Sequence, residues 1–231
     1  MKIISSLFAV LSASALVAVS ANDDSCLSVP TVEDLDLTQY ASKPWYVQQQ
    51  AETSYLPREQ NRCVTAQYEL RKRRSFPWRY TVNVYNYAEN EEGRSFSGGL
   101  CAVYDKSVNS QLKVAPCFLP QFFAGPYWVV AYDEDEGYAL VSGGQPGDVV
   151  EGDAACGSDG NSTCCKTGDG INNSGLWIFT REQEPPSELV EKVRGIANEL
   201  GFSTSVLFDV DHSNCDVPGI DDRVRYLRKG N

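Results

Sequence analysis

The stretch YWVVAYDEDEGYALV, residues 127–141, decides the fold class. Two runs of β-branched and aromatic residues, Tyr127–Tyr132 and Gly137–Val141, flank an acidic turn, which is the pattern of two strands joined in sequence. Similar runs separated by turn residues lie at 44–51, 63–70, 78–87, 94–104, 111–118 and 176–181. Eight strands with mostly short connections predict an all-β, antiparallel protein, either an up-and-down barrel or a sandwich.

Alternation within the strands indicates which side chains face the interior. Apolar and polar residues alternate along 63–70 and again along 78–87, as expected of strands with one buried face. The apolar sets are Val64, Ala66, Tyr68 and Leu70 in the first strand and Trp78, Tyr80, Val82 and Val84 in the second.

One segment has the period of a helix. It follows Pro185 and Pro186, and Gly201 is suited to end it in a left-handed conformation. Its apolar residues form one stripe, so the helix is expected to pack on the outside of the barrel or sandwich. The stripe contains Leu189, Val193, Ile196, Ala197 and Leu200. Residues 205–208 then predict a short ninth strand.

The N-terminus predicts secretion. Residues 1–21 have a basic start, an apolar stretch and a small-residue cleavage site, as in a secretory signal peptide. The eight cysteines are then expected to form disulfides, and Asn161 and Asn172 lie in N-glycosylation sequons. We expect the protein outside the cell or in the endomembrane lumen, and favour the plastid lumen less.

The remaining chain predicts one domain, 22–215, followed by a basic tail, 216–231. Residues 143–175 are rich in Gly, Asp, Asn and Ser and carry three cysteines, which indicates an insertion within that domain. The formal net charge of −11 argues against a nucleic-acid partner, because such a partner requires basic surface.

Three separated blocks resemble the lipocalin family, in particular the branch of apolipoprotein D and the plant plastid lipocalins. The first is LDLTQY at 35–40 with KPWY at 43–46, the second is the stretch at 127–141, and the third is LWIFTR at 176–181. The resemblance extends over about Cys26–Cys215. Lys43 departs from it, because the family has Gly there, and the insertion has no counterpart in short-looped members.

The resemblance implies an eight-stranded antiparallel up-and-down barrel with one C-terminal helix packed outside. It also implies that Arg181 stacks on Trp45 at the closed end, a structural contact without a ligand role. The barrel would hold a small hydrophobic ligand, with the insertion as a candidate lid over the open end. Inward alternation predicts the ligand-binding residues Val64, Ala66, Tyr68, Tyr80, Val82, Val84, Trp177 and Phe179.

No catalytic residues, metal site or cofactor are predicted. His212 is the only histidine, and the sequence contains no nucleophile motif of a hydrolase and no phosphate-binding loop. A secreted carrier of a lipid, sterol, carotenoid or similar molecule, monomeric, is therefore favoured. Two alternatives stay open: an enzyme resembling violaxanthin de-epoxidase, and a secreted module that binds partners through its loops. Transient contact with a membrane or receptor also stays open.

The cysteine pairing is not fixed by the sequence, since eight cysteines allow on the order of a hundred pairings. The family resemblance favours Cys63 with Cys215. Cys101 and Cys117 lie on adjacent predicted strands and form a second candidate pair. The remaining cysteines are Cys26, Cys156, Cys164 and Cys165; we expect Cys26 to reach one cysteine of the insertion and Cys156 another.

Overall fold

The computed structural model describes residues 26–153, 156 and 163–215. The predicted signal peptide, the basic tail and the sequon at Asn161 lie outside these residues. Among the described residues, no helix has both the length and the apolar character needed to cross a membrane.

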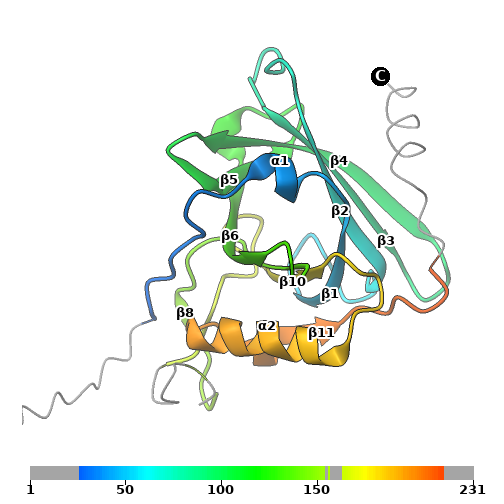
Figure 1. Cartoon of the computed structure of the whole chain (residues 1–231), viewed down its shortest axis with the longest axis vertical. Helices are drawn as coiled ribbons and strands as arrows, with labels where there is room; N and C mark the ends of the chain where they lie inside the picture. The colour runs from blue at the N-terminus through cyan, green and yellow to red at the C-terminus, as the bar shows by residue number, and fades with distance from the viewer. Residues whose placement is uncertain (1–25, 154–155, 157–162, 216–231) are drawn as a thin grey trace, which may run out of the picture.

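Eight antiparallel strands close into a barrel (Figure 1). Neighbouring strands follow in the order β10-β7-β6-β5-β4-β3-β2-β1, and pairing of β1 with β10 closes the ring. This confirms the up-and-down barrel expected from the resemblance. The strands are β1 (Trp45–Ala51), β2 (Arg62–Leu70), β3 (Val82–Glu89), β4 (Ser95–Asp105), β5 (Val108–Pro116), β6 (Gly125–Asp133), β7 (Tyr138–Ser142) and β10 (Leu176–Thr180).

The third strand begins later than the sequence predicts. Arg79 has a φ of 59°, a left-handed conformation that cannot continue a strand, and the Tyr80 amide donates to the Ser75 hydroxyl oxygen at 2.9 Å. The connection therefore stays in a turn until Val82. Alternation across Trp78–Val84 was the wrong basis for placing Tyr80 inside the barrel.

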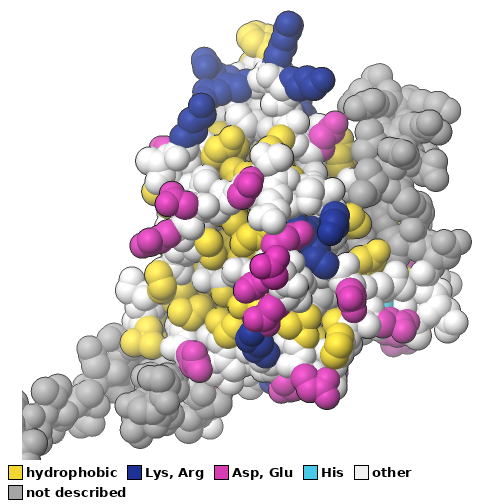
Figure 2. Space-filling model, in the orientation of Figure 1, with side chains coloured by type: hydrophobic (Ala, Val, Ile, Leu, Met, Phe, Trp, Pro, Cys, Tyr) yellow, Lys and Arg dark blue, Asp and Glu magenta, His cyan; other side chains and the backbone are white. Residues whose placement is uncertain are grey.

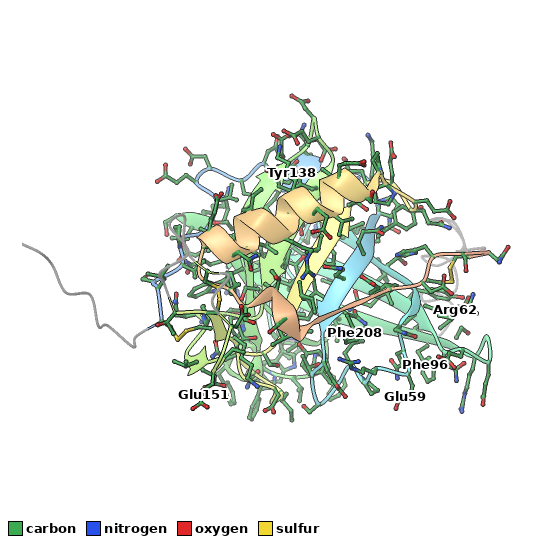
Figure 3. The ribbon with its side chains drawn as sticks, turned by 90° about the horizontal axis from the view of Figure 1, so that it is seen from below. Glu59, Arg62, Phe96, Tyr138, Glu151 and Phe208 are labelled. Atoms are coloured by element: carbon green, nitrogen blue, oxygen red, sulfur yellow. A yellow bond between two sulfur atoms is a disulfide. The ribbon has the colours of Figure 1, made fainter. Side chains whose placement is uncertain are left out.

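Helix α2 (Ser187–Glu199) packs across the outer face of the barrel, as expected (Figures 1 and 3). Val193 and Ala197 are fully buried against Leu140 of β7 and Ile178 of β10. Gly201, with a φ of 86°, follows the helix. The chain then passes through the short 3₁₀ helix η2 (Thr204–Val206) to the ninth strand of this sheet, β11 (Leu207–Asp209), which pairs with the outer end of β1.

A short helix closes one end of the barrel and was not predicted. Helix α1 (Leu37–Tyr40) begins after Asp36, whose carboxylate accepts from the amides of Thr38 and Gln39. The helix is only four residues long, too short to show a periodic pattern in the sequence. It buries Leu37 and Tyr40 beneath the barrel interior.

Arg181 completes this closed end. Its guanidinium carbon lies 3.5 Å from the centre of the Trp45 ring, as the resemblance implies. Its Nη2 and Nε donate to Glu134 at 2.7 and 3.0 Å, and its Nη1 donates to the Lys43 carbonyl oxygen at 2.7 Å. Lys43, at the position where the resemblance implies glycine, therefore accepts a hydrogen bond through its backbone carbonyl oxygen. Its side chain is exposed.

The insertion is attached to the barrel rather than folded apart from it. It contains a two-stranded sheet of β8 (Asp148–Val149) and β9 (Cys165–Lys166). The Cys165 amide donates to the Gly201 carbonyl oxygen, and the Ser203 amide donates to the Cys165 carbonyl oxygen, at 2.9 and 2.8 Å. These bonds dock the insertion against the segment that follows α2.

Four disulfides connect all eight cysteines. Cys63 is bonded to Cys215 and Cys101 to Cys117, which are the two pairs favoured from the sequence. Of the other four cysteines, Cys26 reaches Cys165 and Cys156 pairs with Cys164, both in agreement with the expectation. Two bridges thus join the N-terminal quarter of the described chain to its C-terminal part.

Candidate ligand-binding cavity

The barrel encloses a cavity of about 570 Å³ that opens at the end opposite Trp45. Strand direction sets this geometry: β1 starts at the closed end with Trp45, and its last residues reach the mouth. The volume lies within the range typical of small-molecule sites. A smaller hollow of about 290 Å³ lies outside the barrel and is lined partly by Glu52, Arg58, Lys166 and Asp169.

Six of the eight predicted ligand-binding residues line this cavity. They come from three strands and are Val64, Ala66, Tyr68, Val84, Trp177 and Phe179. Val82 faces the interior but belongs to the packed core and does not line the cavity. Tyr80 lies on the outer face of the barrel, buried against Cys101 and Ala115, and its hydroxyl donates to the Leu119 carbonyl oxygen at 2.9 Å. That these residues bind a ligand remains a prediction.

Sequence reasoning missed several lining residues on other strands. Gln50 lines the cavity because the pairing of β1 with β10 shifts between Val47 and Gln49, which changes the alternation along β1. Tyr127, Leu100 and Val114 also line it. Alternation within the predicted strands 94–104, 111–118 and 127–132 was the signal that could have identified these three residues.

The polar side chains that line the cavity are amides, hydroxyls and phenols, which are uncharged. Apart from tyrosines, its lining contains no acidic, basic or histidine side chain among the described residues. Gln50 is fully buried, and its Oε1 has no hydrogen-bond partner in the described part of the chain. The lining therefore favours a predominantly apolar ligand.

Three tyrosine hydroxyls meet at the deep end. The Tyr127 hydroxyl lies 2.7 Å from the Tyr40 hydroxyl and 2.6 Å from the Tyr68 hydroxyl. Burial raises the pKa of all three phenols above the ordinary value. They are therefore neutral at physiological pH.

Exposed apolar side chains surround the mouth. Tyr55 in the β1–β2 connection, Phe123 in the 3₁₀ helix η1 (Gln121–Phe123) and Ile171 in the insertion line the cavity and are 48%, 53% and 80% exposed. Phe118 and Phe122, which lie close to Phe123 in the sequence, are also exposed. Figure 3 shows Phe96, another mouth residue, at the same side of the barrel as Glu59 of the β1–β2 connection.

The insertion reaches across the mouth. Residues 171–174 line the cavity, and the Tyr55 hydroxyl donates to the Ser174 carbonyl oxygen at 3.2 Å. The Ser54 amide donates to the Asp169 carbonyl oxygen at 2.9 Å. Asn172, the described sequon residue, is exposed at this rim. Its glycosylation remains a prediction.

The one histidine of the chain lies away from the cavity. His212 is buried outside the barrel, and its Nε2 lies 2.8 Å from the Val47 carbonyl oxygen. The described residues contain no cluster of His, Cys, Asp and Glu suited to a metal ion.

Known proteins share this architecture. No family model matches the chain. Apolipoprotein D of Macaca fascicularis is 23% identical over 192 residues, which cover 82% of this chain and 84% of that protein. Apocrustacyanin C1 has a TM-score of 0.53 at 12% identity, covering 88% of this chain and 98% of its own. The cockroach allergen Per a 4 has a TM-score of 0.52 at 18% identity, covering 84% and 98%.

The chain has the lipocalin fold. The resemblance to the lipocalins in three sequence blocks is confirmed, because the likeness to apolipoprotein D extends over most of both chains. Within the lipocalin fold, Trp45 and Arg181 lie at the closed end and the cavity opens at the other.

Proposed function

We propose that this protein is a secreted lipocalin that binds and carries a small hydrophobic molecule in the barrel. The observation that carries the proposal is the cavity of about 570 Å³, whose described lining contains no charged side chain. Burying the apolar surface of a ligand there is favourable by about 25 cal/mol for each Å² removed from water. The likeness to apolipoprotein D and apocrustacyanin supports a carrier rather than an enzyme.

The proposal includes processing and location. Residues 1–21 would be removed as a signal peptide, leaving the domain 22–215 with its insertion 143–175 and the basic tail 216–231. Four disulfides support folding in an oxidising compartment. Bonds from the β1–β2 connection to the insertion support a role for the insertion in controlling access to the cavity.

Two adjacent glycines provide a matched test. Gly98 lines the cavity and Gly99 does not, and a Cβ atom at either position would meet no other atom within 4 Å. Gly98→Phe places a ring in the cavity, whereas Gly99→Phe places the same ring on the other face of β4. Titration with the fluorescent hydrocarbon diphenylhexatriene should show binding to the wild type and Gly99→Phe. Binding to Gly98→Phe should be at least tenfold weaker.

Two outcomes of this titration would contradict the proposal. If the folded wild type does not bind the hydrocarbon, or if both variants bind it equally, the barrel is not a hydrophobic binding site. If the hydrocarbon binds as expected, mass spectrometry of the protein recovered from its natural source would identify the class of ligand it carries.

The enzyme alternative receives no support from the cavity. A de-epoxidase would need an acid near its substrate, and no carboxylate lines the cavity among the described residues. We therefore expect no product when the protein is incubated with an epoxy-carotenoid and a reductant at acidic or neutral pH. A de-epoxidised product would overturn the carrier assignment.

A further inference from the structure

The connection between β2 and β3 concentrates positive charge on an acidic protein. Residues 71–79, here called the basic tip, contain five basic residues and no acidic one, whereas the whole chain has a formal net charge of −11. Figure 2 shows Lys and Arg side chains gathered at this tip. Four of the five are exposed and form no ion pair with an acidic side chain among the described residues: Lys72, Arg73, Arg74 and Arg79. They are available to an external negative charge.

An aromatic ring is exposed among these cations. Phe76 lies between Arg74 and Arg79 in the sequence and is 96% exposed. No other large apolar residue in the described part of the chain is exposed to this degree. A single exposed apolar side chain is ordinary on a protein surface. An aromatic ring among unpaired cations, however, is typical of segments that bind where lipid headgroups meet acyl chains.

Hydrogen bonds hold the base of the basic tip. The Ser75 amide donates to the Tyr80 carbonyl oxygen, and the Tyr80 amide donates to the Ser75 hydroxyl oxygen, both at 2.9 Å. The Trp78 indole N–H donates to the Phe118 carbonyl oxygen, and the Tyr80 hydroxyl donates to the Leu119 carbonyl oxygen, also at 2.9 Å. Both of these acceptors lie between β5 and β6. The tip is therefore attached to a second connection.

The stagger of the strands explains how the two connections meet. Val82, the first residue of β3, pairs with Ala102 of β4, which pairs with Val114 near the end of β5. The start of β3 is therefore level with the end of β5. The connection that precedes β3 and the connection that follows β5 lie side by side for this reason.

The β5–β6 connection carries further exposed aromatic side chains and reaches the cavity. Residues 117–124 contain no charged residue. Phe118 and Phe122 are 77% and 79% exposed, and the centre of the Phe122 ring lies 4.2 Å from that of Phe123. Phe123 also lines the cavity. Exposed aromatic side chains thus occur on both connections, and the second connection contributes to the cavity mouth.

We propose that the basic tip docks on a membrane surface that contains anionic phospholipids, with the adjoining β5–β6 connection facing the same surface. Lys72, Arg73, Arg74 and Arg79 attract the lipid phosphates and carboxylates, and Phe76 enters the layer between headgroups and acyl chains. This inference goes beyond the proposed carrier function, because docking requires no ligand in the barrel.

The chemistry of the basic tip fits a bilayer better than a soluble polyanion. A polyanion would neutralise the cations but leave Phe76 in water, whereas a bilayer offers a negative surface with an apolar layer beneath it. The acidic remainder of the protein is repelled by the same surface. Salt screens that repulsion beyond about 8 Å at physiological ionic strength, while the tip itself lies at the lipid. Docking is therefore oriented, with the tip toward the membrane.

Sedimentation with lipid vesicles tests the proposal on the full chain. The wild type should bind phosphatidylcholine vesicles that contain about 30% phosphatidylserine, and it should not bind vesicles of phosphatidylcholine alone. Raising the NaCl concentration from about 0.1 M to about 0.5 M should release it, because salt screens the attraction. Absence of binding to the anionic vesicles at low salt would overturn the proposal.

Two charge variants locate the binding surface. Arg73→Gln/Arg74→Gln should weaken binding to the anionic vesicles about ten- to thirtyfold. The matched control is Arg58→Gln/Arg94→Gln, which removes the same charge from exposed residues at the opposite ends of β2 and β3 and should have little effect. Equal effects of the two double variants, or undiminished binding by the first, would place the interaction elsewhere and overturn the proposal.

Variants of the aromatic ring distinguish a bilayer from a polyanion. Phe76→Ser should weaken vesicle binding about three- to tenfold, whereas Phe76→Trp should retain it. Neither substitution should change the weak, salt-sensitive retention expected on heparin. Vesicle binding that does not depend on Phe76 would overturn the proposed insertion, and binding to heparin without binding to vesicles would identify a polyanion site instead.

Hydrocarbon binding separates this proposal from the proposed function. All of these variants should bind diphenylhexatriene as the wild type does, which also shows that they are folded. Loss of vesicle binding with intact hydrocarbon binding would therefore concern the basic tip alone. Wild-type protein that binds the vesicles but not the hydrocarbon would support docking and contradict the carrier function.

Discussion

His212 shows how a single residue makes stability depend on pH. Its side chain is buried outside the barrel, where its Nε2 lies 2.8 Å from the Val47 carbonyl oxygen and its Nδ1 has no partner among the described residues. Nε2 carries the proton in the tautomer that satisfies this bond. Burial lowers the pKa of His212, because protonation of Nδ1 would place a charge and an unpaired donor in this environment.

The sign of the pH dependence follows from this lowered pKa. The unfolded chain, with a histidine pKa of about 6.5, binds the proton more readily than the folded chain. The contribution of His212 is therefore fully present above about pH 6.5 and is lost as the pH falls through the folded value. The urea midpoint of the wild type should decline between pH 7.5 and 5, and that of His212→Gln should decline less. Parallel declines would contradict this account.

At the scale of the elements, two glycines of the α2 segment have different structural roles. In α2, Gly195 lies within the helix and a Cβ atom there would meet nothing within 4 Å, whereas Gly201 has a φ of 86° and lies against Leu27. Gly195→Ala should stabilise the protein by about 0.5–1 kcal/mol, because alanine loses less entropy in a helix. Gly201→Ala should destabilise it by about 1–2 kcal/mol, because alanine is strained in the left-handed conformation.

Denaturant unfolding of the two variants measures this difference directly. Both substitutions add the same methyl group, but only the methyl at Gly201 adds backbone strain and close contact with Leu27. A destabilised Gly195→Ala or an unaffected Gly201→Ala would show that the assigned helix end is wrong.

Strand positions could be predicted from the sequence because alternation is a local property. It located the interior faces of β2, of β10 and of β3 from Val82 onward, and with them six residues of the cavity lining. It failed where the backbone departed from regular geometry, at Arg79 before β3 and at the shift between Val47 and Gln49 in β1. Neither departure leaves a clear sign in the residue types, so Tyr80 was misplaced and Gln50 was missed.

The meeting of three tyrosine hydroxyls at the deep end of the cavity could not be predicted for a different reason. Tyr40, Tyr68 and Tyr127 are far apart in the sequence, and their hydroxyls meet only because α1 closes the barrel beneath β2 and β6. Such a contact depends on the tertiary structure, and no spacing within a single element indicates it.

At the scale of the whole molecule, charge is distributed unevenly. The protein is acidic, with a net charge of −11, yet Lys and Arg side chains gather at the tip formed by the β2–β3 connection, at the top of Figures 1 and 2. Lys72, Arg73, Arg74 and Arg79 are exposed there, and Phe76 is 96% exposed. This tip is at the opposite end of β2 from the cavity mouth.

The exposed tip is also the expected site of first cleavage by trypsin, which cuts after Lys and Arg in accessible loops. Under non-reducing conditions the cut protein should migrate as one species, and after reduction it should separate into an N-terminal piece ending near Arg74 and a larger C-terminal piece. Separation without reduction would contradict the disulfide pairing.

The same outcome is expected for a cut anywhere in a long stretch of the chain, because two disulfides enclose that stretch. Cys26 and Cys63 precede the tip, and their partners Cys165 and Cys215 follow it. Every peptide bond between residues 63 and 165 is therefore spanned by both bridges. A single break in that stretch leaves a two-chain protein whose parts remain covalently joined, so the barrel can survive damage to its backbone for as long as its surroundings stay oxidising.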